Sequence, residues 1–125
     1  VIVIDPKKHD DVVAHTSHVQ HIVASALTHA ILGCADPTER ALRWAGCASG
    51  FRDTSRIASS DPVMWREIVE NNTDAILGAM DSFESKLAEM RGVIEQHRFE
   101  DFQNSFANGK AMRDAWLADT ERKKL

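Results

Sequence analysis

Apolar residues recur at a helical period through the first part of the chain. Between Asp5-Pro6 and Gly33 no proline or glycine interrupts the sequence. An aspartate followed by proline is a typical helix start, and glycine often follows a helix C-terminus. At about 100° per residue, one face collects a stripe made of Val12, Val19, Val23, Ala26 and Ala30. We therefore expect one long helix to Leu32, with this stripe in the core.

The same start signal occurs twice more and opens two further helices. Asp36-Pro37 begins a helix that is expected to run to about Cys47, and Asp61-Pro62 begins a third. The polar residues 71–74 then mark a break, or only a kink, before the next apolar pattern.

Two longer helical patterns complete the chain. Their apolar positions are Ile76, Leu77, Met80, Phe83, Leu87, Met90 and Ile94 in the first pattern, and Phe99, Phe102, Phe106, Met112, Trp116 and Leu117 in the second. The first should end near His97, Asn108-Gly109 is a candidate interruption of the second, and residues 120–125 are expected to form a solvated tail. The predicted fold class is all-α, with several helices of unequal length.

The first residues have a different pattern. Val1 to Ile4 are β-branched and lead into Asp5-Pro6, which is typical of a short strand. Every later segment has a helical pattern, so this strand finds no partner in the chain. We expect a chain cut from a larger protein whose sheet lies upstream.

The charge balance argues against several classes of partner. The 125 residues include 15 Lys and Arg and 19 Asp and Glu, mixed along the chain, for a net charge of −4. Nucleic acids and anionic membranes need clustered positive charge, and no apolar run approaches the roughly 20 residues that span a bilayer. No signal-peptide pattern is present either. We expect a cytoplasmic protein without nucleic-acid or membrane partners, in which Cys34 and Cys47 are buried thiols.

Five of the six histidines fall on the first predicted helix. Four of them lie within about 120° of one another, beside the apolar stripe: His15, His18, His21 and His29. This edge should face a cleft or a neighbouring segment. Histidines at i and i+3 can share a metal ion, but no His-Glu-x-x-His motif and no Glu-x-x-His pair is present. A site for an organic anion is favoured over a metal site.

Two segments together resemble a known family. The first comprises His9-Asp10, Ala14, Ser17-His18 and His21, and the second is GFRDTSRIASSDPVMWR, residues 50–66. They resemble the C-terminal helical domain of prephenate and arogenate dehydrogenases, the NAD(P)-dependent enzymes of tyrosine synthesis. That family carries His-Asp, Ala and Ser-His-x-x-His, followed by Gly-Phe-Arg/Lys-Asp-x-Thr/Ser-Arg-Ile-Ala-x-Ser-Asp-Pro-x-Met-Trp-Arg.

The resemblance covers the whole chain and implies its place in a larger enzyme. Residues 1–5 would be a remnant of the last strand of an upstream dinucleotide-binding domain. Residues 6–125 would be a helical domain that binds prephenate or arogenate and forms a homodimer. The family's catalytic histidine lies upstream, and no Gly-x-Gly-x-x-Gly follows a strand here. No catalytic, cofactor-binding or metal residue is therefore expected in this chain, which should be inactive alone, and NAD or NADP would bind only to the full-length enzyme.

The resemblance also implies roles for individual residues. Prephenate carries two carboxylates, and Arg56 corresponds to the residue that pairs with one of them, because a guanidinium binds a carboxylate through two hydrogen bonds. Arg52 matches a variable position and is expected to be solvated. His21 would donate hydrogen bonds to the anionic substrate. Ser17, one turn away, either assists or is a small packing residue, and His18 is expected to be structural.

The remaining expected site residues are Gly50, Asp53, Ser60 and Trp65. Asp53 matches an acidic residue at the pocket mouth, and a helix N-cap is an equal alternative. Ser60 and Trp65 border the pocket, although plain core is the stronger interpretation for Trp65.

Two departures from the family pattern bear on substrate choice. Gln20 replaces a usual proline, and Cys47-Ala48-Ser49-Gly50 replaces a frequent glycine run. The choice of substrate between prephenate and arogenate, and the choice of cofactor between NAD and NADP, therefore stay open. Two other hypotheses are a non-catalytic helical interaction module and a histidine-rich metal-binding bundle.

Overall fold

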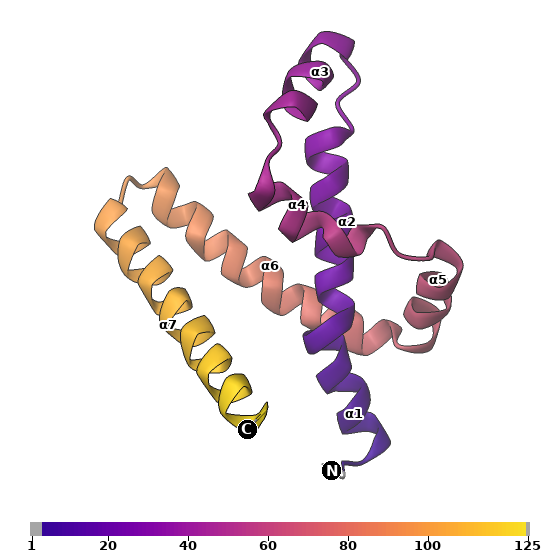
Figure 1. Ribbon diagram of the computed structural model, residues 1–125. Helices are drawn as coiled ribbons and strands as arrows, with labels where there is room; N and C mark the ends of the chain where they lie inside the picture. The colour runs from indigo at the N-terminus through magenta and orange to yellow at the C-terminus, as the bar shows by residue number, and fades with distance from the viewer. Residues whose placement is uncertain (1–3, 125) are drawn as a thin grey trace. The chain divides into compact units, whose positions relative to one another are not determined.

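The chain is helical throughout the part that the structure describes. A computed structural model describes residues 4–124 (Figure 1). Its elements are α1 (Pro6–Val13), the π-helical segment η1 (Ala14–His18), α2 (Val19–Leu32), α3 (Pro37–Gly46), α4 (Ser49–Ser55), the 3₁₀ turn η2 (Arg56–Ala58), α5 (Pro62–Asn71), α6 (Thr73–Glu95) and α7 (Phe99–Lys124). The predicted all-α class is confirmed. The predicted strand falls on residues 1–3, which lie outside the described residues, and on Ile4, which is in no regular element.

Three helices begin where the Asp-Pro dipeptides predict. Asp5, Asp36 and Asp61 each accept a hydrogen bond from a backbone N–H of the following turn, at 3.1, 2.8 and 3.1 Å. In each helix the next residue is a proline, which lacks the N–H that a first turn would leave unpaired. Asn72 has a non-helical backbone, so residues 71–74 hold a real break between α5 and α6.

The predicted core stripe on the first helix is only partly correct, although the helical run to Leu32 is continuous. Val19 packs against the buried core and Val23 is half-buried. Val12, Ala26 and Ala30 are exposed, whereas Ala14 and Ala24 are buried. The cause is η1, in which the Val19 N–H bonds to the Ala14 carbonyl five residues earlier. A π-turn adds one residue, which rotates the downstream face by about 100° relative to a uniform α-helix.

The chain divides into two compact units, Val1–Asp81 and Ser82–Leu125. In the first unit, Ala14 packs against Ile76 and Ala79 at the start of α6, with Val19, Ile22, Ile68, Ala75 and Met80 around them. Ala14 and Ala79 are 0% and 2% exposed, so this contact is closed to solvent.

The segments that follow α2 fold back onto it. The Arg43 side chain of α3 donates to the Ala30 carbonyl at 3.2 Å, and the Trp44 indole donates to the Leu32 carbonyl at 3.3 Å. Next along the chain, α4 and η2 contact α2, and α4 crosses it in Figure 1. This places η2 and α5 at the histidine-bearing face of α2.

The second unit consists of the end of α6, the turn at His97 and α7. His97 has a φ of 55°, and the Arg98 N–H bonds to the Val93 carbonyl while the His97 N–H bonds to the Ile94 carbonyl. This is a Schellman C-cap with histidine in the left-handed position that glycine usually takes.

Helix α7 is longer than the sequence predicts. It runs unbroken through Asn108-Gly109, and residues 120–124 belong to it instead of forming a separate tail. Asp119 pairs with Arg122 and Lys123 at 2.9 and 3.0 Å, which supports the last turns. The exposed large apolar residues of this unit are Phe83, Leu87, Ile94, Phe99, Phe106, Met112 and Trp116.

Candidate functional site

A cavity of about 470 Å³ lies between α2, η2 and α5 in the first unit. Its size is within the range of small-molecule sites in proteins. Three of the predicted site residues line it: His21, Ser60 and Trp65. The other lining residues are Ile22, Ser25, Ile57, Ala58, Pro62, Arg66, Val69 and Glu70. The wall is thus mostly apolar, with a few polar groups.

Two contacts hold the His21 ring. Its Nδ1 lies 2.9 Å from the Ser17 carbonyl oxygen in η1. Because a carbonyl oxygen only accepts, Nδ1 carries the proton of this bond. The ring also stacks on Trp65, with centroids 4.1 Å apart and planes 25° apart. Nε2 is then the ring nitrogen that a ligand in the cavity would meet.

Trp65 is held between two histidines. His18 meets the indole edge-on, with ring centroids 5.8 Å apart and planes at 87°. The indole Nε1 is buried and has no hydrogen-bond partner among the described residues. The interpretation of Trp65 as plain core therefore needs correction, because Trp65 is half-buried and carries an unused donor beside the cavity.

His18 is tied to the break between α5 and α6. Its Nδ1 lies 3.3 Å from Nδ2 of Asn72. Burial lowers the pKa of His18 most strongly, nearby His21 lowers it further, and Asp10 opposes both. The structural role expected for His18 agrees with these contacts.

Sequence reasoning missed an ion pair at the cavity. Arg66 Nε donates to Glu70 at 2.6 Å, and both residues line the cavity with His21. The sequence pattern that could have revealed this pair is an arginine four residues before a glutamate on a helix that begins at Pro62. Since the pair is neutral as a whole, it adds little net charge to the site.

The two arginines of the motif lie elsewhere. Arg56 and Arg52 are exposed and line a separate hollow of about 450 Å³ beside Cys47, Phe51 and Ser59. Arg56 directly precedes Ile57, which does line the main cavity.

Neither Asp53 nor Gly50 is among the residues that line the cavity. Asp53 lies inside α4, whose N-cap is Ala48, so the N-cap alternative for Asp53 is wrong. A Cβ added at Gly50 would meet nothing within 4 Å.

Ser17 faces a third hollow, of about 440 Å³, together with His9, Asp10, His18 and Glu67. Only its carbonyl reaches the His21 site, through the Nδ1 bond.

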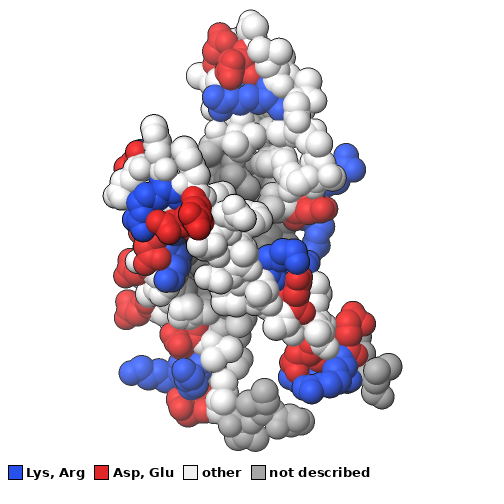
Figure 2. Space-filling view, turned by 90° about the vertical axis from the view of Figure 1, so that its left-hand side faces the viewer, with Lys and Arg blue, Asp and Glu red and all other residues white. Residues whose placement is uncertain are grey.

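Several further features of the described residues bear on the sequence expectations: the cysteines, the possible metal ligands, the apolar length of the helices and the distribution of charge. Cys34 and Cys47 are free and half-buried, so the expectation of buried thiols is only partly met. Among the described residues, no group of three or more His, Cys, Asp or Glu side chains is placed to hold a metal ion. No helix in the described ranges is long and apolar enough to cross a membrane. Basic and acidic residues are interspersed on the face that Figure 2 shows.

Comparison with known proteins points to one family. The family model "Prephenate dehydrogenase, dimerization domain" matches residues 5–108. A prephenate dehydrogenase of Bacillus subtilis (strain 168) is 38% identical over 111 residues, which are 89% of this chain and 29% of that protein. A second one, from Lactococcus lactis, is 33% identical over 114 residues, 91% of this chain and 32% of that protein. The chain thus spans about three tenths of the length of these relatives.

A solved structure agrees in fold. The Synechocystis arogenate dehydrogenase superposes with a TM-score of 0.86 at 26% identity, over 92% of this chain and 41% of that one. The A. aeolicus prephenate dehydrogenase, in complex with hydroxyphenyl propionate and NAD+, gives a TM-score of 0.79 at 32% identity, over 88% of this chain and 38% of that one. With a family model matched over most of its length, the chain belongs to the prephenate dehydrogenase dimerization-domain family.

Proposed function

We propose that the full-length protein is an NAD(P)-dependent prephenate or arogenate dehydrogenase, and that this chain contributes substrate-binding groups and the dimer interface. The observation that carries the proposal is the cavity in which His21, Ser60 and Trp65 of the two family motifs meet. Its volume of about 470 Å³ suits a ring-bearing carboxylic acid. The A. aeolicus relative in complex with hydroxyphenyl propionate supports this class of ligand.

His21 is proposed to contact the anionic end of the substrate through Nε2. Since Nδ1–H is engaged by the Ser17 carbonyl, a neutral ring presents a lone pair at Nε2, and only the imidazolium donates there. A bound carboxylate would favour the imidazolium, because opposite charges a few ångströms apart stabilise each other. The buried N–H of Trp65 is a second donor available at the same wall.

The fixed positive charge of the site is proposed to come from Arg56. Arg66 is neutralised by Glu70 at 2.6 Å, so it is a poor candidate for a substrate carboxylate. Arg56 has no ion-pair partner within the described residues and is next to Ile57 of the cavity wall. An unpaired guanidinium is free to form a two-point contact with a carboxylate.

The nicotinamide cofactor would accept the hydride and is proposed to bind outside this chain. The described residues contain no strand, and the sequence has no glycine-rich turn after one, so nothing here fits a pyrophosphate. The residues of this chain bind the substrate carboxylates, orient the ring against Trp65 and exclude water from one side of it.

The oligomeric state and the compartment complete the proposal. We propose a homodimer, since the described residues of the second unit include seven exposed large apolar side chains and the matched family is described as a dimerization domain. A cytoplasmic location is proposed from the class of biosynthetic enzyme.

The test uses the full-length protein with prephenate and with arogenate, each with NAD+ and NADP+. We expect cofactor reduction with at least one pair. His21→Asn should lower kcat/KM about 10- to 100-fold, the range for one lost hydrogen bond to a charged group. His29→Asn is the matched control, because His29 lies on the same helix, is exposed and does not line the cavity. No reduction with any pair, or equal losses in both variants, would contradict the proposal.

A further inference from the structure

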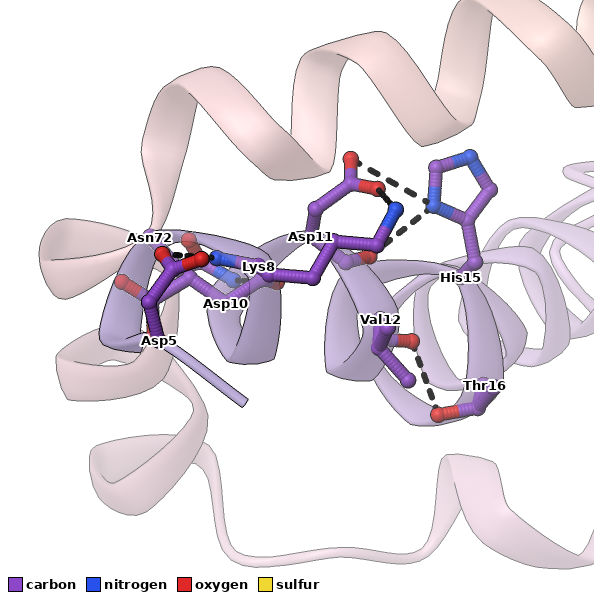
Figure 3. A network of polar contacts seen from close by, with 8 residues as sticks. All are labelled: Asp5, Lys8, Asp10, Asp11, Val12, His15, Thr16 and Asn72. Carbon is purple, nitrogen blue, oxygen red and sulfur yellow. Dashed lines mark hydrogen bonds and ion pairs between the residues drawn. The ribbon is translucent and has the colours of Figure 1, made fainter. Parts of the chain in front are cut away.

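Asn72 joins two parts of the first unit that are far apart in sequence. It lies in the break between α5 and α6 and is half-buried. Its Nδ2 donates to the Asp10 carbonyl of α1 at 2.9 Å, as Figure 3 shows. The same nitrogen lies 3.3 Å from Nδ1 of His18. One amide group therefore contacts both the backbone of α1 and a histidine ring of η1.

These contacts define the state of the His18 ring. The Asp10 carbonyl only accepts, so the group facing it must be the NH₂ of Asn72 and not its carbonyl oxygen. The second Asn72 contact is then also made by a donor, which requires a lone pair on Nδ1 of His18. His18 is thus neutral, with its proton on Nε2.

The groups around His18 are consistent with a neutral ring. His21 of α2 and burial lower its pKa, and Asp10 of α1 opposes them. His9 of α1 and Glu67 of α5 line the same hollow. Protonation at Nδ1 would set two donors against each other and break the contact with Asn72.

From His18 the contacts lead to the cavity. The His18 ring meets Trp65 edge-on, and the other contact of the indole is the stacked ring of His21. Asn72 does not line the cavity itself. Its influence on the cavity would pass through three rings in sequence.

We propose that Asn72 and His18 are positioning residues, which set the orientation of Trp65 and, through it, the orientation of the His21 ring that faces the ligand. The claim that this orientation affects substrate binding rests on the proposed function. The claim that Asn72 and His18 set the orientation does not.

The test compares three variants in the full-length protein. Asn72→Leu removes both hydrogen bonds, and Asn72→Ala removes them with a smaller side chain that needs no extra space. Asn71→Leu is the matched control, because the Asn71 side chain donates only to Glu67 of its own helix. Circular dichroism and a thermal melt establish that each variant is folded.

The first readout is the NMR position of the His21 ring C–H resonances. Stacking on the indole displaces these resonances in the wild type. Asn72→Leu and Asn72→Ala should return them toward the position of a free histidine, and Asn71→Leu should not. If Asn72→Leu does not fold, Asn72→Ala decides. Unchanged His21 resonances in a folded Asn72→Ala variant would overturn the proposal.

The second readout is kinetic. With the substrate that the wild type turns over, the two Asn72 variants should raise KM about 10-fold with a smaller change in kcat, because a misplaced binding group weakens substrate binding. Equal effects from Asn71→Leu would count against positioning. A wild type that turns over neither substrate would refute the proposed function, while the NMR readout would still decide the role of Asn72.

Discussion

The imidazole of His21 lies nearly flat against the indole of Trp65, with planes 25° apart and centroids separated by 4.1 Å. His21 comes from α2 and Trp65 from α5, so the stack joins the two motifs that the sequence places about forty residues apart. Stacked aromatic pairs contribute about 0.5–1.5 kcal/mol beyond the area they bury. The pair therefore both fastens α5 to α2 and forms one wall of the cavity.

Substitution of Trp65 should separate these two roles. Trp65→Phe keeps a ring for His21 but removes the buried N–H, so the melting temperature should change little while substrate affinity falls. Trp65→Ala removes the stack as well and should lower the free energy of unfolding by about 2–3 kcal/mol, less than for a fully buried tryptophan. Urea unfolding and substrate titration measure the two effects. A larger loss of stability in the phenylalanine variant would show that the N–H already has a structural partner.

Arg56→Ala in the full-length enzyme should lower kcat/KM about 30-fold or more. The physical reason is loss of a charge-assisted contact worth roughly 2–5 kcal/mol in a partly desolvated site. Lysine should restore only part of this loss, since an ammonium lacks the planar fork. Arg52→Ala is the control and should cost little, because Arg52 lies inside α4 and neither of its chain neighbours lines the cavity. The reverse order of effects would refute the assignment, and melts of each variant must accompany the kinetics.

The second unit should form a dimer interface. Phe106 and Trp116 are 63% and 60% exposed on α7, which is costly for side chains of this size. Light scattering should give a dimer mass, and Phe106→Asp with Trp116→Asp should shift it to a monomer. Asn104→Asp, a charge change on an exposed side chain about 160° around α7 from Phe106 and about 120° from Trp116, should leave the dimer intact. A wild-type monomer at tens of micromolar would be evidence against the interface.

Stability should fall in acid through His18. Burial and His21 lower the pKa of His18 below its ordinary value of 6.5, so the unfolded chain binds more protons than the folded chain as the pH drops below about that value. The contribution of His18 to the free energy of unfolding is complete above the unfolded pKa and is lost as the pH falls through the folded pKa. Urea unfolding from about pH 8 to about pH 5 should show this loss, and His18→Gln should flatten it. An identical slope in that variant would assign the effect to other groups.

His97→Val should destabilise the turn between α6 and α7. A β-branched residue in the left-handed conformation of His97 costs about 1–2 kcal/mol. The stacking of the His97 ring on Phe99, with ring centroids 5.4 Å apart, would also be lost. His97→Gly relieves the backbone but loses the same contact, so its change should be small. Thermal melts of the two variants measure the difference. Equal losses would mean that the ring contact, and not the backbone, determines the preference at this position.

The starts of three helices were predicted correctly because each depends only on a few neighbouring residues in the sequence. The aspartate caps at Asp5, Asp36 and Asp61 need only the next few residues to form. The break at Asn72 could not be told from a kink, since its amide bonds to Asp10, a residue far away in sequence. Helix α7 continues through Gly109 because a single glycine costs a helix only about 1 kcal/mol, which neighbouring helix formers offset.

The sequence predicted only part of the cavity lining, because four of the expected site residues lie outside it: Ser17, Gly50, Asp53 and Arg56. His21, Ser60 and Trp65 belong to the two motifs of the resemblance and line one cavity. The motifs could indicate this because residues of a family motif often lie together in the family's fold. The Arg66–Glu70 pair was missed because an i, i+4 pair on a helix surface is common and carries no functional signal. Arg56 lies in a different hollow, and sequence spacing says nothing about the direction of a long side chain at the end of a 3₁₀ turn.

The π-helical turn at Ala14–His18 gives this segment one place where its length can change. Thr16 is exposed and would tolerate many substitutions. Deletion of Thr16 would convert the π-turn to an ordinary α-turn, and because the π-turn already accommodates one added residue, the two halves of the helix would keep their relative orientation. Ala14 would still pack against α6, and His21 would still stack on Trp65. Removal of a residue from the regular part of α2 between His18 and His21 would instead rotate His21 by about 100° away from Trp65. The same change in length should therefore be accepted inside the π-turn and rejected one turn later.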